Sequence, residues 1–215
     1  MEKNINFKYV VVEGPIGVGK TSLTDLVSKE FHYKQVLETV EENPFLTKFY
    51  KEMKNFAFQT QMFFLLNRYK QQQALFQNEL FNSGVISDYL FEKDRIFAYV
   101  NLDESELVLY EKLYAILKPQ VPKPDLVIYL QANTETLIKR IKLRGRHYEK
   151  TIGHEYLDKL NRAYNDFFLR YKDSPLLIIN TNEIDFVHKM GDLSDLIKTI
   201  REMEAGTKYY LPISS

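Results

Sequence analysis

The sequence predicts an α/β protein in which helices flank a parallel sheet of about five strands, with residues 1–215 forming one domain. Short apolar runs rich in β-branched residues alternate with longer segments whose apolar residues recur at helical spacing. This alternation is typical of a parallel sheet covered on both faces. The chain has 215 residues, of which 45% are hydrophobic, and no repeat or long linker interrupts it, so one sizeable core is expected.

The first predicted strand covers residues 7–13 (FKYVVVE) and runs directly into a cluster of glycines. Beyond the cluster, Leu23, Val27 and Phe31 recur at helical spacing, which predicts a helix over residues 20–31. The chain therefore opens as strand, loop and helix. A second strand is expected just before Glu38, and further strands are expected at residues 85–87, 126–130 and 176–179.

Two helical insertions are expected between these strands. A long region of about residues 44–81 is rich in Phe, Leu and Gln. Another helix is expected to begin at Asp103, because Asp103 and Glu106 have the spacing of a capping box. It should end before a cluster of prolines, Pro119, Pro122 and Pro124.

Composition excludes several classes of protein. The 29 Lys and Arg residues balance 29 Asp and Glu residues, so the chain has no excess of positive charge with which to bind nucleic acid. Without cysteine there is no disulfide, no thiolate zinc site and no Cys nucleophile. The polar N-terminus and the lack of an apolar run of roughly 20 residues predict a cytoplasmic protein with no membrane partner.

The glycine cluster fits the pattern G-x-x-x-x-G-K-[ST], which predicts a P-loop NTPase-type fold. Backbone N–H groups of such a loop surround phosphates, Lys20 reaches the β- and γ-phosphates, and the Thr21 hydroxyl can bind Mg²⁺. A chance glycine turn that caps a helix is the structural alternative. The residues concerned are Gly14, Pro15, Ile16, Gly17, Val18, Gly19, Lys20 and Thr21.

A carboxylate, Asp88, follows the predicted strand at residues 85–87. P-loop proteins place at this position the acid that supports Mg²⁺, so Thr21 and Asp88 are the candidate metal ligands. A lone Asp in this position also fits a simple helix cap.

Residues 139–150 (KRIKLRGRHYEK) carry six Lys and Arg residues and one acid. Arg140 and Arg144 lie four residues apart on a predicted helix, and Gly145 lets the chain reverse so that Arg146 can join them. Three guanidinium groups can then stabilise a transferring phosphoryl group. The glycine predicts an arginine-rich lid over about residues 144–153. A solvated basic helix face is the alternative.

These segments together resemble the deoxynucleoside kinase family, whose members phosphorylate the 5′-hydroxyl of deoxynucleosides in nucleotide salvage. The resemblance covers about residues 10–186 and is closest to the bacterial deoxyguanosine kinases. It rests on the glycine loop, on Glu38-Thr39-Val40, Gln61 with Arg68, Asp88 and Asp94-Arg95, and on the pattern Arg140, Arg144, Gly145, Arg146 and Glu149.

For the acceptor, the resemblance implies that Glu38 takes the proton from the 5′-hydroxyl. It implies that Gln61, Arg68 and Asp94 bind the base. Gln59 competes for the role of Gln61, and all of these polar residues could instead be surface groups. The remaining acceptor-binding residues implied are Asp88 and the pair Tyr50 and Glu149, which binds the 3′-hydroxyl.

For the donor, the resemblance implies ATP or another nucleoside triphosphate with Mg²⁺. Lys20, Arg140, Arg144 and Arg146 would stabilise the transferred group, with Arg144 also binding the donor. Residues 182–186 resemble the loop that holds the donor base, through Asp185 and Phe186, although a polar loop would look similar. A homodimer formed through the long helices is also implied.

Two features leave assignments open. Most relatives follow the strand acid with Arg, whereas Asp88 is followed by Tyr89, and Arg146 or Lys20 are the candidates to supply the missing charge. An aromatic stripe could stack on the base, although core packing is the commoner role of such a stripe. It consists of Phe56, Phe58, Phe63 and Phe64.

The predicted function is a deoxynucleoside kinase for purines, with deoxyguanosine favoured. A deoxyadenosine/deoxycytidine kinase is the first alternative, because Arg68 beside Asp94 favours guanine, adenine or cytosine over thymine. A thymidylate-kinase-like monophosphate kinase follows, but residues 44–97 contain only Arg68 and Arg95 as arginines. A non-enzymatic P-loop switch is less favoured, because residues 88–91 read Asp-Tyr-Leu-Phe rather than Asp-x-x-Gly.

Overall fold

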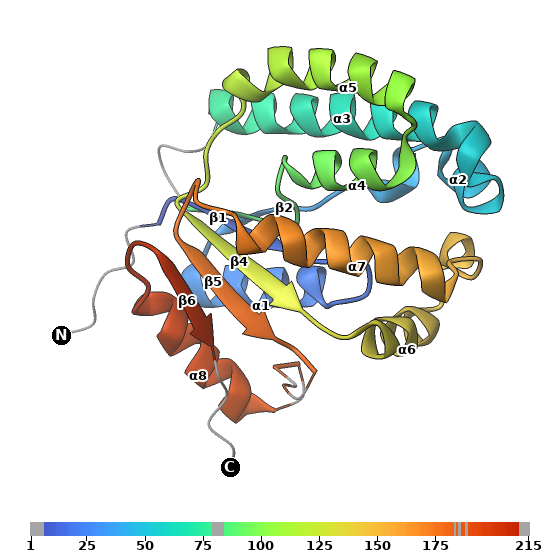
Figure 1. The fold of residues 1–215 in the computed structure, drawn as a ribbon. Coiled ribbons are helices and arrows are strands. Elements are labelled where there is room, and N and C mark those ends of the chain that lie inside the picture. The colour runs from blue at the N-terminus through green and yellow to red at the C-terminus, as the bar shows by residue number, and fades with distance from the viewer. Residues whose placement is uncertain (1–6, 79–83, 183, 185, 188, 211–215) are drawn as a thin grey trace.

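The computed structural model describes residues 7–78, 84–182, 184, 186–187 and 189–210. Its centre is a six-stranded sheet in the order β2-β3-β1-β4-β5-β6, in which every pairing is parallel (Figure 1). The strands are β1 (Tyr9–Glu13), β2 (Lys34–Val36), β3 (Val85–Ser87), β4 (Leu126–Gln131), β5 (Leu176–Asn180) and β6 (Thr207–Tyr210).

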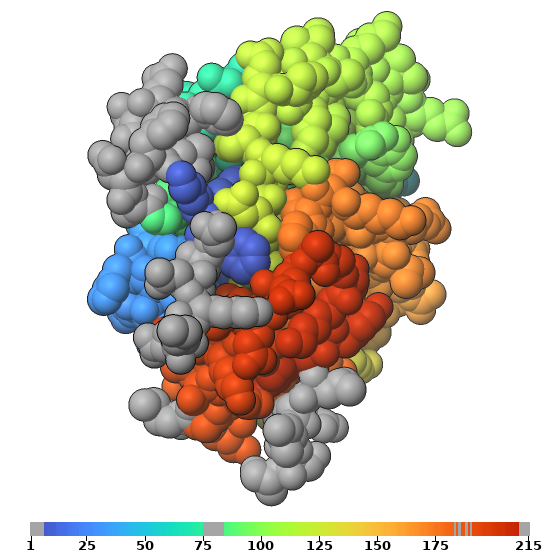
Figure 2. Space-filling model, turned by 90° about the vertical axis from the view of Figure 1, so that its left-hand side faces the viewer, coloured from blue at the N-terminus to red at the C-terminus, as the bar shows by residue number. Residues whose placement is uncertain are grey.

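The parallel sheet is confirmed, with one strand more than expected. β6 pairs only with β5, and three of its four residues are exposed. A short, mostly exposed edge strand lacks the continuous apolar run of a buried strand, so its sequence TKYY gave little signal. Figure 2 shows the segment towards the C-terminus, in red, on the surface of the molecule.

Helices cover both faces of the sheet because alternate side chains of its strands point to opposite faces. Val10 and Val12 of β1 pack with residues of α1 (Lys20–Phe31), α6 (Thr134–Arg144) and α8 (Met190–Arg201). Tyr9 and Val11 pack on the other face with residues of α4 (Lys93–Asn101) and α7 (His154–Leu169).

A third layer lies beyond α4. It consists of α2 (Leu46–Lys51), α3 (Met53–Asn78) and α5 (Glu104–Leu117), and Figure 1 shows α3 and α5 on the side of α4 away from the sheet. Leu65, Phe91 and Tyr110 belong to the apolar cluster that joins this layer. Among the helices of the described residues, none is long and apolar enough to cross a membrane.

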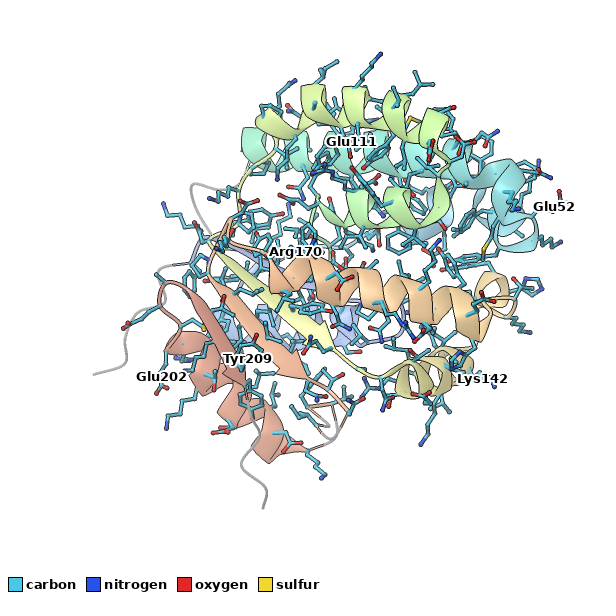
Figure 3. The ribbon with its side chains drawn as sticks, in the orientation of Figure 1. Glu52, Glu111, Lys142, Arg170, Glu202 and Tyr209 are labelled. Atoms are coloured by element: carbon cyan, nitrogen blue, oxygen red, sulfur yellow. The ribbon has the colours of Figure 1, made fainter. Side chains whose placement is uncertain are left out.

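The helix expectations are largely confirmed. Asp103 caps α5 in a capping box with Glu106, and α5 ends at Leu117. A 3-10 turn, Lys118–Gln120, follows and includes the first of the three prolines. The expected helical region of residues 44–81 is two helices, because the backbone of Glu52 leaves helical geometry with φ −139° and ψ 67°. Figure 3 labels Glu52. Residues 79–81 lie outside the described residues.

The glycine loop contacts the helix that precedes the predicted lid. Gly17 has φ +85°, and a Cβ atom placed there would lie 2.7 Å from Ile141 Cγ1 and 2.9 Å from the Leu137 carbonyl oxygen of α6. Only glycine permits this approach, so the loop and α6 keep a fixed relative position.

Gly17→Ala is therefore expected to lower the free energy of unfolding by about 1–3 kcal/mol, through backbone strain and overlap with α6. Urea unfolding of the two proteins measures the difference. Gly191→Ala is the control, because among the described residues no atom outside its chain neighbours and its own helix backbone lies within 4 Å of the added Cβ. Equal stability of the Gly17→Ala protein and the unsubstituted protein would contradict the fixed contact.

Candidate functional site

The glycine loop joins the end of β1 to the start of α1, as its sequence predicts. Gly19, in the left-handed region at φ 109°, precedes the first residue of α1, and Lys20 begins the helix. The Lys20 ammonium donates to the carbonyl oxygens of Gly14 (2.7 Å) and Pro15 (3.2 Å). The helix N-terminus and Lys20 together provide the positive end that a phosphate group requires.

A cavity of about 800 Å³ adjoins the loop. Residues 17–22 line one part of it, and α6 and its following turn line another, through Arg140, Arg144 and Arg146. The three arginines therefore border one cavity. Phe186 also lines it and is buried, whereas Asp185 lies outside the described residues.

The three arginines differ in what they contact. Arg140 donates to the Val18 carbonyl oxygen (3.1 Å), to Thr181 Oγ1 (2.9 Å) and to the Thr181 carbonyl oxygen (2.7 Å), so it ties the glycine loop to the end of β5. Arg144 pairs with Glu149 at 2.5 Å, and Arg146 lies 3.5 Å from Glu41. Arg140 therefore supports the loop backbone, while Arg144 and Arg146 contact carboxylates.

Asp88 connects the loop to the rest of the site. Thr21 Oγ1 donates to Asp88 Oδ2 (2.7 Å), and the Glu38 backbone N–H donates to Asp88 Oδ1 (2.8 Å). β2 and β3 are neighbours in the parallel sheet, so Glu38 and Asp88 follow strand ends at the same edge. Asp88 of the predicted metal pair therefore contacts both Thr21 and the backbone of the predicted base, Glu38.

The predicted acceptor residues meet in a buried charge cluster, which we define as Glu38, Arg68, Lys93 and Asp94. Arg68 Nε and Nη2 donate to Glu38 Oε1 at 2.8 and 2.5 Å, and Arg68 Nη1 pairs with Asp94 Oδ2. The Lys93 ammonium lies 2.5 Å from Glu38 Oε2. No side chain of the cluster is more than 9% exposed, and its two cations balance its two carboxylates.

Hydrogen bonds around Asp94 identify which glutamine belongs to the site. Gln61 Nε2 donates to the Asp94 carbonyl oxygen (2.9 Å) and to Oδ1 (2.6 Å), and the Tyr110 hydroxyl donates to Oδ1 (3.1 Å). Gln61 is buried, whereas its competitor Gln59 is exposed. Gln61, Arg68 and Asp94 therefore form one hydrogen-bonded group.

The cluster controls the ionisation of its members. Burial alone would raise the pKa of Glu38, but the positive charges of Lys93 and Arg68 outweigh it and hold that pKa well below its usual range. Burial would lower the pKa of Arg68, but Glu38 and Asp94 raise it instead. Glu38 is therefore an anion and Arg68 a cation at neutral pH.

Of the pair predicted to bind the sugar, Glu149 belongs to the predicted lid, and Tyr50 contacts the lid through Tyr148. Burial raises the pKa of Tyr50 well above its usual value, with further contributions from Tyr156 and Glu149. Glu149 is 5% exposed. Tyr148 stacks on Tyr50 with ring centres 6.3 Å apart and donates to Glu41 (2.9 Å).

The aromatic stripe of α3 divides between two roles. Phe56 and Phe58 pack against the apolar cluster that includes α5, which confirms core packing for them. The Phe64 ring lies 4.7 Å from the Arg68 guanidinium carbon, so Phe64 borders the buried charge cluster.

Sequence reasoning missed Lys93, Tyr110 and Glu13. Glu13 accepts from the N–H groups of Gly14 (2.7 Å) and Leu90 (2.7 Å), so it links the glycine loop to the segment after β3. Burial raises its pKa, although Lys93 and Lys20 oppose that rise. An acid that ends a wholly buried strand is a signal that could have identified Glu13.

Residues 10–204 match the family model for deoxynucleoside kinase. The chain is 36% identical to a deoxyguanosine kinase of Bacillus subtilis, over 91% of this chain and 97% of that protein. It is 32% identical to a deoxyadenosine kinase of Lactobacillus acidophilus, over 90% of this chain and 94% of that protein.

Solved structures of deoxynucleoside kinases have the same fold as this chain. The fold matches deoxyadenosine kinase from M. mycoides with bound dCTP at a TM-score of 0.79 and 29% identity, covering 91% of this chain and 100% of that one. The same kinase with bound dATP matches at a TM-score of 0.79 and 30% identity, over 90% and 100% of the two chains. The fold, the site geometry and the family match together show that this chain belongs to the deoxynucleoside kinase family.

Proposed function

We propose that the protein transfers the γ-phosphoryl group of ATP, or of a similar triphosphate, to the 5′-hydroxyl of a purine deoxynucleoside in nucleotide salvage, with deoxyguanosine as the preferred acceptor. One observation carries the proposal: Asp88 bonds both Thr21, beside the phosphate-binding loop, and Glu38, in the buried charge cluster. A phosphate site and a carboxylate base thereby adjoin each other.

Glu38 is suited to the role of base. Its carboxylate is ionised, because Lys93 and Arg68 keep its pKa low despite burial. Phosphoryl transfer passes through a loose transition state in which the nucleophile needs a positioned acceptor for its proton more than a strong base. We expect Tyr50 and Glu149 to bind the sugar on the side of the lid.

Arg68 supports guanine as the preferred base. A guanidinium has five N–H donors, and the contacts of Arg68 with Glu38 and Asp94 use one on Nε, one on Nη1 and one on Nη2. The two remaining donors, one on each terminal nitrogen, match the adjacent O6 and N7 acceptors of guanine. Gln61 commits its amide nitrogen to Asp94, so its oxygen can accept from the base.

The donor binds over the glycine loop. Lys20 and the start of α1 would hold the phosphates, and Arg144 and Arg146 border the same cavity. Thr21 and Asp88 offer adjacent oxygen atoms, which is the donor set that Mg²⁺ prefers when substrate phosphates complete its coordination. When bound, Mg²⁺ would neutralise charge on the phosphates. We also expect a cytoplasmic homodimer.

The charge balance of the acceptor site supports a nucleoside over a nucleoside monophosphate. Arg68 and Lys93 are both paired with carboxylates of the buried charge cluster. A monophosphate would add negative charge to a buried cluster with no net positive charge to receive it.

The first test is an acceptor panel of the four deoxynucleosides with their monophosphates, and kcat/KM is the quantity measured. Deoxyguanosine is expected to rank first, because guanine offers the O6 and N7 pair to Arg68. Deoxyadenosine and deoxycytidine should follow, because their bases still offer a ring-nitrogen acceptor, and thymidine should rank last, because thymine offers none. Phosphorylation of the monophosphates alone would overturn the proposal.

The second test uses the pH dependence of donor binding. Burial, together with repulsion from Lys93, lowers the pKa of Lys20 to about 8, although Glu13, Glu38 and Asp88 oppose this. Above pH 8 the amine loses its charge, so the Kd for ATP is expected to rise about tenfold between pH 7 and pH 9. Calorimetry at pH 8 should also show proton uptake on binding.

Lys20→Arg should remove this pH dependence, because arginine stays charged at pH 9. Lys29→Met, on the exposed surface of α1, should keep it. A Kd that is the same at pH 7 and pH 9 would show that Lys20 is not the group whose charge binds the triphosphate.

A further inference from the structure

The residue that follows Asp88, the acid at the end of β3, supplies no positive charge to the acceptor site. Tyr89 occupies this position, and its side chain is fully buried. A cation that acts beside Glu38 must therefore come from another element.

Lys93, the first residue of α4, brings a cation to this place. Its ammonium lies 2.5 Å from Glu38 Oε2, and its side chain is 6% exposed. Its positive charge also acts on the glycine loop, because after burial it is the next cause of the lowered pKa of Lys20. Lys93 therefore pairs with the predicted base and influences the phosphate-binding loop electrostatically.

The two oxygens of Glu38 differ in what they can still accept. A carboxylate oxygen accepts about two hydrogen bonds. Oε1 already accepts two from Arg68, at 2.8 and 2.5 Å, whereas Oε2 accepts one, from Lys93. The remaining acceptor position is on Oε2, beside the Lys93 ammonium.

The ammonium has donors to spare. A lysine ammonium has three N–H donors. Glu38 is the one hydrogen-bond acceptor recorded for Lys93 Nζ among the described residues, and the Phe97 ring lies 5.7 Å from it. Two donors of a side chain that is more than nine-tenths buried therefore remain next to the open position on Oε2.

We propose, resting on the proposed function, that Lys93 is a further residue of the reaction: it holds Glu38 so that Oε2 faces the 5′-hydroxyl, and it donates to the attacking oxygen. The O5′–H bond breaks and its proton passes to Glu38 Oε2. The oxygen's electron pair forms the bond to the γ-phosphorus. The bond from that phosphorus to the bridging oxygen breaks, and its electron pair leaves with the diphosphate.

The other two cations considered for this charge make different contacts. Lys20 donates to two carbonyl oxygens of the glycine loop, at 2.7 and 3.2 Å. Arg146 lies 3.5 Å from Glu41 and is 37% exposed. Lys93 alone among these three forms an ion pair with Glu38.

The test compares steady-state kinetics of Lys93→Met and Lys93→Arg with those of the unsubstituted protein, using deoxyguanosine and ATP. Lys93→Met is expected to lower kcat about 10²-fold, the loss typical of one donor to a reacting oxygen. KM for deoxyguanosine should stay within about threefold, because the base contacts are intact. Lys93→Arg, which keeps the charge, should recover at least about a tenth of the original kcat.

Lys118→Met is the matched control. Lys118 pairs with Glu92, the neighbour of Lys93, so this change also removes a lysine that pairs with a buried carboxylate but leaves Glu38 untouched. Its kcat should stay near that of the unsubstituted protein. If Lys93→Met does not fold, Lys93→Gln replaces it, and the same changes in kcat and KM are expected.

The inference is overturned if Lys93→Met keeps kcat within about threefold. It is also overturned if kcat falls equally in Lys118→Met, or if Lys93→Met raises KM for deoxyguanosine and leaves kcat unchanged. An unsubstituted protein that phosphorylates no deoxynucleoside would instead overturn the proposed function. An active unsubstituted protein with an unaffected Lys93→Met variant would overturn this inference alone.

Discussion

The candidate site depends on one buried charge cluster, in which Glu38, Arg68, Lys93 and Asp94 neutralise one another. Removing one partner of a buried ion pair typically costs about 3–5 kcal/mol, because the other charge is left unpaired. The cluster joins three segments: the end of β2, the middle of α3 and the start of α4. The balance of these charges therefore fixes the positions of α3 and α4 and of the predicted catalytic base, Glu38.

Asp88 extends the effect of the cluster to the glycine loop. It accepts hydrogen bonds from the Glu38 N–H and the Thr21 hydroxyl, so the segment of the catalytic base and the phosphate site share one carboxylate. Glu13 makes a further link, between the glycine loop at Gly14 and the segment after β3 at Leu90. The predicted base and the phosphate-binding loop, which come from distant parts of the sequence, are thus held together at the carboxyl ends of the strands. Holding two reacting groups close together in this way is a large contribution to catalysis.

Much of this could be predicted from the sequence, where local patterns determine structure. The glycine loop, the Asp103 capping box and the helix end at Gly145 each depend on residues close together in the chain. Lys93, Tyr110 and the structural contacts of Arg140 could not be predicted in this way, because their partners lie far away in the sequence. β6 was missed because an exposed edge strand carries little apolar signal.

A crystal structure with deoxyguanosine and a non-hydrolysable ATP analogue would test most directly whether the buried charge cluster forms the acceptor site. We expect the 5′-oxygen within about 3 Å of Glu38 Oε2, with guanine against Arg68 and Gln61 and the triphosphate over the glycine loop. A nucleoside bound elsewhere, with Arg68 and Lys93 still closed on Glu38, would contradict the central role of the cluster.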